Sequence, residues 1–323
     1  MSREYSIGID IGGTKIAAGL VNRAGKVIGL SEVPTPNENR QGIYKVLRDL
    51  VHSLTRFAAR QGIAVKGIGI GTAGQIDFAG GRVLSGTTNI ADWNDVPLRD
   101  EMSKYISLPV WVDNDVNAAA LAEYHFGAAR GHNDAVCLTL GTGVGGGVIT
   151  GGTLLRGAWG GAAELGHMTI DLNGPACNCG FRGCLETYAS GTGIARSMRE
   201  KLASFDTNDG PAYALFKKDP SLITSRLVFE WKKNGDPLAV EAMNEMTTAL
   251  SFGIVNLIHV FNPTMVVLGG GIMKDGEWIR DAVRQKAGTL GLRSLVDPVT
   301  IEIAELGAAA GLIGAAYQCW LYG

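Results

Sequence analysis

Apolar positions along the chain fall into short runs of strand type and longer stretches at helical spacing. Short runs rich in β-branched residues predict strands at 65–70, 109–112 and 265–268. Apolar residues three and four positions apart predict helices at 42–61, 116–126 and 237–261. The segment 205–233 is polar and carries mixed helix signals, so we interpret it as a helical insertion. Strands and helices that alternate along the whole chain indicate an α/β fold.

Two segments of the chain repeat one pattern, the first from Tyr5 and the second from Ala135. In each, an apolar strand leads into a Gly/Thr corner, and a second apolar strand and another turn follow. A repeated unit of this kind predicts two related lobes with a cleft between them. We place the N-terminal small lobe at 1–133 and the larger lobe at 134–307. The helix from about residue 308 is expected to pack back on the first lobe.

Composition narrows the class of protein. The 323 residues are 46% hydrophobic and 19% charged, which suits a globular protein with more than one buried core. The formal net charge is −2 and basic residues are not clustered, so nucleic acid is disfavoured as a partner. No run approaches the roughly 18 apolar residues of a membrane span, and the N-terminus lacks the features of a secretion signal. We therefore expect a soluble, cytoplasmic protein with no membrane contact.

The first glycine-rich turn, at 10–15, has the residues of a phosphate-binding turn. Asp10 stands at a strand end, Gly12 and Gly13 let backbone N–H groups approach phosphate oxygens, and Thr14 adds a hydroxyl donor. The carboxylate is suited to hold Mg²⁺ through water. Lys15 belongs to the motif, although its sequence position does not show whether it reaches phosphate. The alternative is a tight β-hairpin without a ligand.

The second glycine-rich turn contains the spacing of a dinucleotide fingerprint. Gly141, Gly143 and Gly146 satisfy G-x-G-x-x-G, and Glu164 lies 18 residues beyond the last of them. That fingerprint requires a helix directly after the turn, whereas a β-strand and another turn follow here. We interpret the turn as a second phosphate-binding hairpin, with Thr142 and Gly143 facing the terminal phosphates.

A third glycine cluster follows the predicted strand at 265–268. We interpret it as a platform for adenosine, and the alternative is a simple turn at a strand end. The cluster consists of Gly269, Gly270 and Gly271.

Two aspartates close a predicted strand just before a helix. Asp113, Asn114 and Asp115 lie where α/β proteins commonly bind ligands, at the carboxyl end of a strand. Phosphoryl transfer to a hydroxyl needs a carboxylate that accepts the hydroxyl proton. Either aspartate could be that base while the other caps the helix, and position alone leaves both readings open.

Three of the five cysteines lie within eight positions. Cys177, Cys179 and Cys184 together with His167 complete a tetrahedral zinc site with no open position, which is typical of a structural site. Three unrelated buried thiols are the alternative. Compact loops of this kind need nearby glycine, which the segment supplies.

Two glutamates flank this predicted zinc loop, Glu164 and Glu186. A loop fixed by zinc would hold their carboxylates as acceptors for the hydroxyls of a polyol. The alternative is that both are ordinary surface residues.

With these motifs assembled in order, the chain resembles the ROK family of sugar kinases, members of the actin/hexokinase fold group. The likeness covers nearly the whole chain and is most specific in ELGHMTIDLNGPACNCGFRGCLE, which contains the family's E-x-G-H and C-x-C-G-x-x-G-C-x-E signature. The other matching segments are 10–15, 113–120, 140–147 and 268–272. The resemblance implies a two-lobed actin-like (ribonuclease H-like) α/β fold with a zinc-stapled loop.

The resemblance also implies roles for individual residues. Asp115 would be the general base, which resolves the choice between the two aspartates, and Asn114 would contact the sugar. The residues implied near the sugar hydroxyls are Gly74, Glu164, His167 and Glu186. His167 would place one ring nitrogen on zinc and the other toward the sugar.

The implied cofactors are ATP, Mg²⁺ and a structural Zn²⁺, and a homodimer or homotetramer is expected. The residues implied to face the ATP phosphates and Mg²⁺ are Asp10, Gly12, Gly13, Thr14, Thr142 and Gly143, and Lys15 belongs to the same cofactor-binding motif. The zinc ligands would be His167, Cys177, Cys179 and Cys184.

Three classes of function are compared: a sugar kinase, a sugar-responsive repressor and a sugar-binding module. The E-x-G-H form with Glu186 looks like the glucokinase branch, which makes glucose 6-phosphate from glucose, and the alternative is a kinase for N-acetylmannosamine or N-acetylglucosamine. Sugar-responsive repressors of the family carry a helix-turn-helix domain before D-x-G-G-T; nine residues precede Asp10 here, which disfavours that reading. A sugar-binding module without catalysis is disfavoured by the presence of Asp115.

Overall fold

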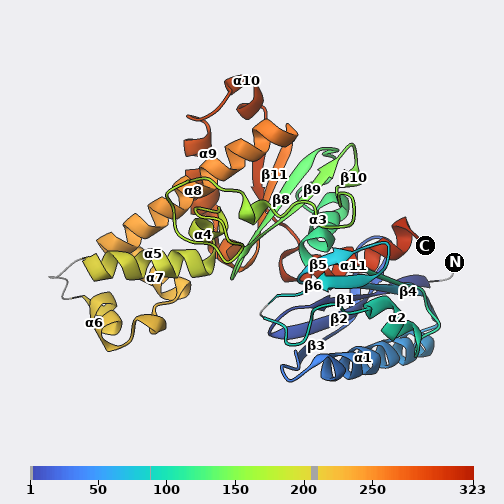
Figure 1. The fold of residues 1–323 in the computed structure, drawn as a ribbon. Coiled ribbons are helices and arrows are strands. Elements are labelled where there is room, and N and C mark those ends of the chain that lie inside the picture. Colours follow the sequence, from blue (N-terminus) through green and yellow to red (C-terminus); the bar gives the residue numbers. More distant parts are fainter. Residues whose placement is uncertain (1–2, 88, 205–209) are drawn as a thin grey trace. The chain divides into compact units, whose positions relative to one another are not determined.

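The computed structural model describes residues 3–87, 89–204 and 210–323. The described residues form two compact units and contain two five-stranded sheets (Figure 1). One unit comprises the chain up to Ala135 together with Gly147–Ala163 and Ala304–Gly323. The other comprises Val136–Gly146 and Glu164–Ile303.

The sheet of the first unit has the strand order β3-β2-β1-β4-β7. These strands are β1 (Arg3–Ile11), β2 (Lys15–Asn22), β3 (Val27–Pro34), β4 (Ile63–Thr72) and β7 (Val110–Asn114). β1, β4 and β7 run parallel, whereas β2 and β3 are antiparallel to their neighbours. The carboxyl ends of three parallel strands therefore meet at one edge, which is where the candidate residues Asp10, Asp113 and Asn114 stand.

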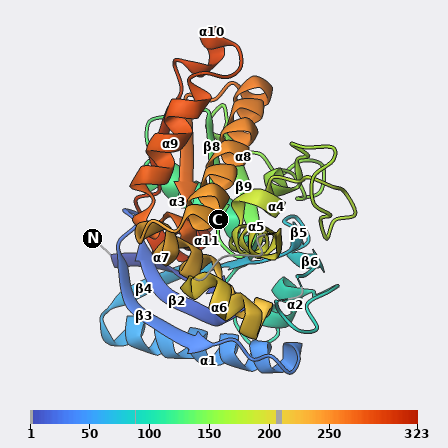
Figure 2. The ribbon, with the colours of Figure 1, turned by 90° about the vertical axis from the view of Figure 1, so that its left-hand side faces the viewer.

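Helices cover both faces of this first sheet. α1 (Arg40–Arg60) lies on one face, and α3 (Asp115–Phe126) and α11 (Ala310–Leu321) pack together on the other (Figures 1 and 2). A Cβ atom on Gly69 of β4 would lie 1.7 Å from the Ala315 carbonyl oxygen. Glycine is therefore required for α11 to lie this close to the sheet. The short elements of this unit are β5 (Gln75–Asp77), β6 (Arg82–Ser85) and α2 (Leu98–Ser103).

The second sheet has the strand order β10-β9-β8-β11-β12. Its strands are β8 (Ala135–Leu140), β9 (Val144–Thr150), β10 (Thr153–Leu154), β11 (Met265–Gly269) and β12 (Thr300–Ile303). The division between the two units falls within β9, because Gly147 is the first residue of that strand counted with the first unit.

The longest helix of the second unit is α8 (Pro237–Phe261), which packs against α5 (Gly191–Ser204), α7 (Ser225–Lys233) and α9 (Glu277–Ala287). Asp236 caps α8 by accepting a hydrogen bond from the Ala239 N–H at 3.0 Å. The remaining helical elements are η1 (Leu165–His167), α4 (Glu186–Ala189), α6 (Pro211–Lys218), η2 (Pro220–Leu222), η3 (Gly271–Asp275), α10 (Arg293–Val296) and, in the first unit, η4 (Gly307–Ala309). Within the described residues, no helix combines the length and apolar character needed to cross a bilayer.

The elements with a strong sequence pattern match the structure to within a few residues: α1, α3, α8, α11, β4, β7 and β11, together with both hairpins. Residues 205–209 of the predicted helical insertion lie outside the described residues, and the rest of it forms α6, η2 and α7. The sequence analysis did not anticipate β5, β6, β12, α2, α5, α9 or α10. Most of these elements are short, and α5 begins with glycines that weaken its helical signal.

Candidate functional site

The turn at 10–15 joins β1 to β2 as a tight hairpin. The Gly12 N–H donates to the Lys15 carbonyl at 3.0 Å, and the Thr35 hydroxyl donates to the Gly12 carbonyl at 2.6 Å. Gly13 and Thr14 are exposed, so their backbone and hydroxyl donors are open to a ligand. The Lys15 ammonium forms an ion pair with Glu32. Because Lys15 is paired with Glu32, a bound anion would have to compete with the Glu32 carboxylate for the Lys15 ammonium.

Asp10 is a largely buried carboxylate at the base of this turn. Burial and the nearby charge of Asp115 raise its pKa from 3.8 to about 7, and Lys15 opposes the rise. The neighbouring strand end carries Gly71, which pairs with Asp10 on one side and Asp113 on the other. The Asp10 and Asp115 carboxylates repel each other, so the site beside them favours a bound cation.

The raised pKa of Asp10 predicts a pH-dependent stabilisation by Asp10→Asn. The folded state holds a proton on Asp10 that the unfolded state loses near pH 4, so Asp10 destabilises the fold progressively between about pH 4 and pH 7. Above pH 7 the cost is on the order of 2–4 kcal/mol. Asp10→Asn should therefore raise the free energy of unfolding in EDTA more at pH 8 than at pH 5. Urea denaturation of both proteins measures this, and an equal gain at both pH values would contradict it.

Asn114 and Asp115 form the junction between β7 and α3. The Asn114 side-chain oxygen caps α3 by accepting from the Val116 and Asn117 N–H groups at 2.8 and 3.1 Å. Its amide group donates to the Gly74 carbonyl at 3.0 Å. The structure thus brings Gly74 and Asn114 together. Asp115 is the first residue of α3.

Asp113 has a different environment. Its side chain is 2% exposed and forms an ion pair with Arg156, whose Nη2 lies 2.7 Å from Asp113 Oδ2. The other carboxylate oxygen accepts from the Asn114 N–H and the Asn117 amide. The carboxylate oxygens of Asp113 are thus engaged by protein donors, and the side chain is buried away from solvent.

His167 and the three clustered cysteines come together in the second unit. Their four ligand atoms all lie within 4.8 Å of one another. Cys177 Sγ is 3.5 Å from His167 Nδ1, and Cys179 Sγ is 3.6 Å from Cys184 Sγ. Two thiolates at about 2.3 Å from one tetrahedral zinc ion would lie about 3.8 Å apart, so the donor set fits a metal ion of this kind.

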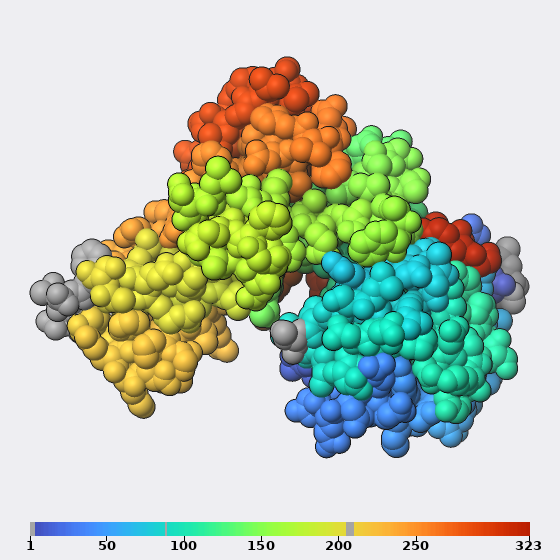
Figure 3. Space-filling model, in the orientation of Figure 1, coloured from blue at the N-terminus to red at the C-terminus, as the bar shows by residue number. Residues whose placement is uncertain are grey.

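The loop that carries these ligands, 164–186, has little regular structure and forms a continuous part of the surface (yellow-green in Figures 1 and 3). Backbone bonds fold it tightly: the Cys177 N–H donates to the Phe181 carbonyl at 2.8 Å, and the Gly180 N–H donates to the Cys177 carbonyl at 3.0 Å. Gly183 has φ +62°, and a Cβ there would lie 1.7 Å from the Asp171 carbonyl oxygen. A bound metal ion would add cross-links to a loop that helices and strands do not stabilise.

Glu164 and Glu186 lie at the two ends of the same loop. Burial raises the pKa of Glu164, the nearby His167 lowers it, and the charge of Glu186 raises it. Glu186 Oε2 accepts from the Val144 N–H at 2.9 Å and lies against Gly143, where an added Cβ would be 2.4 Å away. The structure therefore groups Glu164, His167 and Glu186 and places Glu186 beside the second glycine-rich turn.

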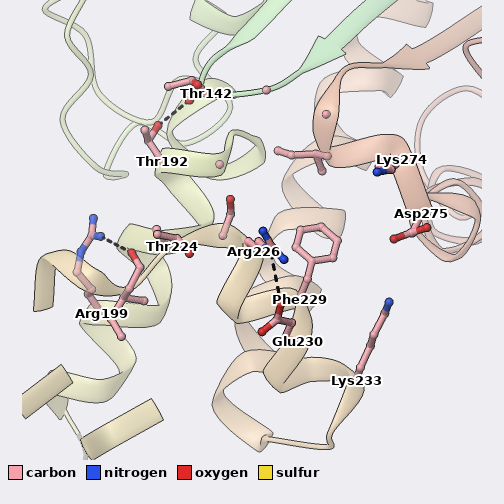
Figure 4. Close-up of a pocket in the computed structure, with 17 residues that line it drawn as sticks. Thr142, Thr192, Arg199, Thr224, Arg226, Phe229, Glu230, Lys233, Lys274 and Asp275 are labelled. Carbon is pink, nitrogen blue, oxygen red and sulfur yellow. Dashed lines mark hydrogen bonds and ion pairs between the residues drawn. The ribbon is translucent and has the colours of Figure 1, made fainter. Parts of the chain in front are cut away.

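A cavity of about 1000 Å³ lies within the second unit (Figure 4). Of the residues predicted to bind nucleotide, Thr142 and Gly271 line it. Gly143, Gly269 and Gly270 are not among the lining residues, and Gly270 instead packs against the backbone of Leu140. Figure 4 shows Thr142 beside Thr192, whose hydroxyl donates to the Thr142 carbonyl at 3.0 Å.

Much of the cavity wall comes from residues that the sequence analysis did not single out. Its charged and aromatic lining residues are Arg199, Arg226, Phe229, Glu230, Lys233, Lys274 and Asp275. Four of these come from α7, the second helix of the predicted insertion, and two from η3. Lys274 and Asp275 follow the third glycine cluster closely in the sequence, which was the one signal that could have indicated them. The residues from α7 had no such signal, because which helix lines a cavity depends on the tertiary structure.

A family model of the ROK family matches residues 6–320. The chain belongs to the ROK family. It is 38% identical over 310 residues to the glucokinase of Thermotoga maritima, which covers 96% of this chain and 95% of the relative.

Two solved ROK structures are similar over nearly the full length. A ROK family glucokinase from Streptomyces griseus, in complex with glucose and AMPPNP, has a TM-score of 0.80 and 37% identity, covering 97% of this chain and 98% of that one. The ROK hexokinase from Thermus thermophilus has a TM-score of 0.81 and 35% identity, covering 98% of each. The predicted family and the predicted α/β fold class are thereby confirmed.

Proposed function

We propose that this ROK protein transfers the terminal phosphoryl group of ATP to the 6-hydroxyl of glucose. The observation that carries the proposal is the full-length similarity to glucokinases, one of them bound to glucose and the ATP analogue AMPPNP. The candidate sites found in the two units supply the groups that this reaction needs.

In the first unit, Asp115 is proposed as the general base. It would accept the proton of the sugar hydroxyl while that oxygen forms a bond to the γ-phosphorus and the bond from phosphorus to the ADP oxygen breaks. Asp113 is unsuited to this role because Arg156 and two N–H donors engage its buried carboxylate. Asp10 is proposed to hold Mg²⁺, which would neutralise phosphate charge when bound. Gly12, Gly13 and Thr14 would donate to phosphate oxygens.

In the second unit, the sugar hydroxyls are proposed to bind Glu164, His167 and Glu186. Two carboxylates and an imidazole supply acceptors and a donor for several hydroxyls of one ring. The hydrogen bond from the Val144 N–H to Glu186 fixes that carboxylate before substrate arrives, which reduces the ordering cost of binding.

The cavity of the second unit is proposed to bind the nucleotide. Its lining has four basic and two acidic side chains, so it favours a polyphosphate. The Phe229 ring offers an apolar face for the purine (Figure 4). Thr142 would donate its hydroxyl toward the phosphates. The proposed role of α7 is to form one wall of the nucleotide site.

Zn²⁺ is proposed to bind His167, Cys177, Cys179 and Cys184. Four protein ligands leave no coordination position for substrate, so the ion would stabilise the loop between Glu164 and Glu186 and supply no Lewis-acid chemistry. The homo-oligomeric state and the cytoplasmic location stay predictions.

An assay of ATP·Mg²⁺ consumption across glucose, mannose, fructose, N-acetylglucosamine and N-acetylmannosamine tests the proposal. We expect kcat/KM to be highest for glucose, with the phosphoryl group on the 6-hydroxyl as shown by NMR of the product. Preference for an N-acetyl sugar would replace the proposed substrate and retain the kinase reaction. Sugar binding without turnover on any of the five would overturn the kinase proposal.

A further inference from the structure

Arg156 stands out in the first unit as a positively charged side chain that no motif singled out. It follows β10, and its guanidinium is largely buried, with the side chain 14% exposed. Its Nε and Nη2 donate to Asp113 Oδ2 at 3.0 and 2.7 Å. Buried arginine side chains with this many specific partners commonly hold a neighbouring group in one geometry.

Aromatic residues hold Arg156 from the other side. Its guanidinium lies 3.8 Å from the centre of the Phe78 ring, and its Nη1 donates to the Tyr322 hydroxyl at 2.9 Å. The Phe78 and Tyr322 rings themselves meet edge to face at 5.1 Å. Three segments far apart in the sequence thus fix the position of one guanidinium group, which limits the positions open to Asp113.

Hydrogen bonds connect Asp113 to the turn between β7 and α3. Asp113 Oδ1 accepts from the Asn114 N–H at 2.8 Å and from the Asn117 side-chain amide at 3.0 Å. Asn114 in turn caps α3 and donates to the Gly74 carbonyl. The residue after Asn114 is Asp115, so its backbone direction depends on this set of bonds.

We propose that Arg156 is a positioning residue that acts through Asp113 to orient Asp115 for proton transfer. The inference rests on the proposed kinase function. Arg156 need not contact substrate, because its effect is transmitted by Asp113, Asn114 and Asn117. Without Arg156, Asp113 is a buried carboxylate without a cation, and it would take up a proton or move toward solvent. Either change disturbs the acceptor that holds the Asn114 N–H.

The test is steady-state kinetics of Arg156→Gln with glucose and ATP. We expect kcat to fall about 10- to 100-fold, since a displacement near 1 Å of a reacting group can cost that much. KM for both substrates should change less than about threefold, because the substrate-binding groups remain. Arg156→Lys should recover part of kcat, since lysine restores the cation but not the planar guanidinium that donates through two nitrogens.

The double variant Asp113→Asn/Arg156→Gln provides a rescue that a purely structural role would not predict. It replaces the ion pair with two neutral amides, removes the unpaired charge and keeps an oxygen for the Asn114 N–H. Its kcat should exceed that of Arg156→Gln alone. This comparison also keeps the proposal testable if Arg156→Gln folds poorly.

Arg99→Gln is a matched control. The Arg99 guanidinium donates to the Val110, Ala79 and Phe78 carbonyls and, among the residues that the structure describes, to no carboxylate. We expect a loss of thermal stability without a selective loss of kcat. Unchanged kcat in Arg156→Gln, or equal losses of kcat in Arg156→Gln and Arg99→Gln, would overturn the positioning role. Absence of turnover in the unmodified protein would instead contradict the proposed kinase function, so the two failures are distinguishable.

Discussion

Asp115→Ala is expected to lower kcat for glucose phosphorylation by about 10²- to 10⁴-fold, the usual contribution of a general base. Asp115→Asn should show a loss of similar size, because an amide keeps the shape but does not accept the hydroxyl proton. The proposal assigns this role to Asp115, the first residue of α3, because Arg156 and two N–H donors engage the buried carboxylate of Asp113.

A measurement of glucose affinity distinguishes loss of the general base from loss of the glucose-binding site. Calorimetric titration with glucose should give a Kd for Asp115→Asn within about tenfold of the unmodified protein, because other groups hold the remaining hydroxyls. Asp100→Asn is a control matched for position, since Asp100 lies in the first turn of α2. A kcat for Asp115→Asn within about threefold of the unmodified value would remove Asp115 from the role of base.

Loss of zinc is expected to cost the protein both its stability and its activity. Cys179→Ser should lose the metal and lower Tm by about 10 °C or more, since metal binding to such a site is part of the folding free energy. Activity should fall with it, because the ligands lie between Glu164 and Glu186 along the chain and share the loop with them. Metal content by mass spectrometry, together with thermal denaturation, measures both effects.

Cys319→Ala is the control for the loss of a thiol. Cys319 is buried in α11 of the first unit, outside the metal cluster. This variant should keep its metal and lose only packing energy, on the order of 1 kcal/mol. Intact protein purified without zinc, or a Cys179→Ser variant with unchanged metal content, would contradict the zinc assignment.

Local sequence patterns were sufficient to predict much of the fold. α8 has a capping aspartate, proline in its first turn and a long apolar stripe, all within one segment, so its bounds were predicted from the sequence. α5 and α9 were missed although each is longer than ten residues. Their apolar residues are fewer, and their stability comes from packing against α8, which sequence periodicity does not report.

The sequence by itself determined the cluster of three cysteines and one histidine and the hairpin turns, because these depend on residue types at short spacing. Cys177, Cys179 and Cys184 are close in the chain, and only His167 had to be brought to them over ten positions. Glycine and threonine in the turn at 10–15 likewise specify a local backbone geometry.

Tertiary structure alone decided which charges are available for chemistry. Arg156 lies 43 positions from Asp113, and Lys15 lies 17 positions from Glu32, so neither ion pair has a spacing that a sequence pattern reveals. The wall that Phe229 adds to the cavity depends in the same way on where α7 packs. Electrostatic and packing partners are set by distance in space, and only the folded chain brings distant segments within the few ångströms at which these interactions act.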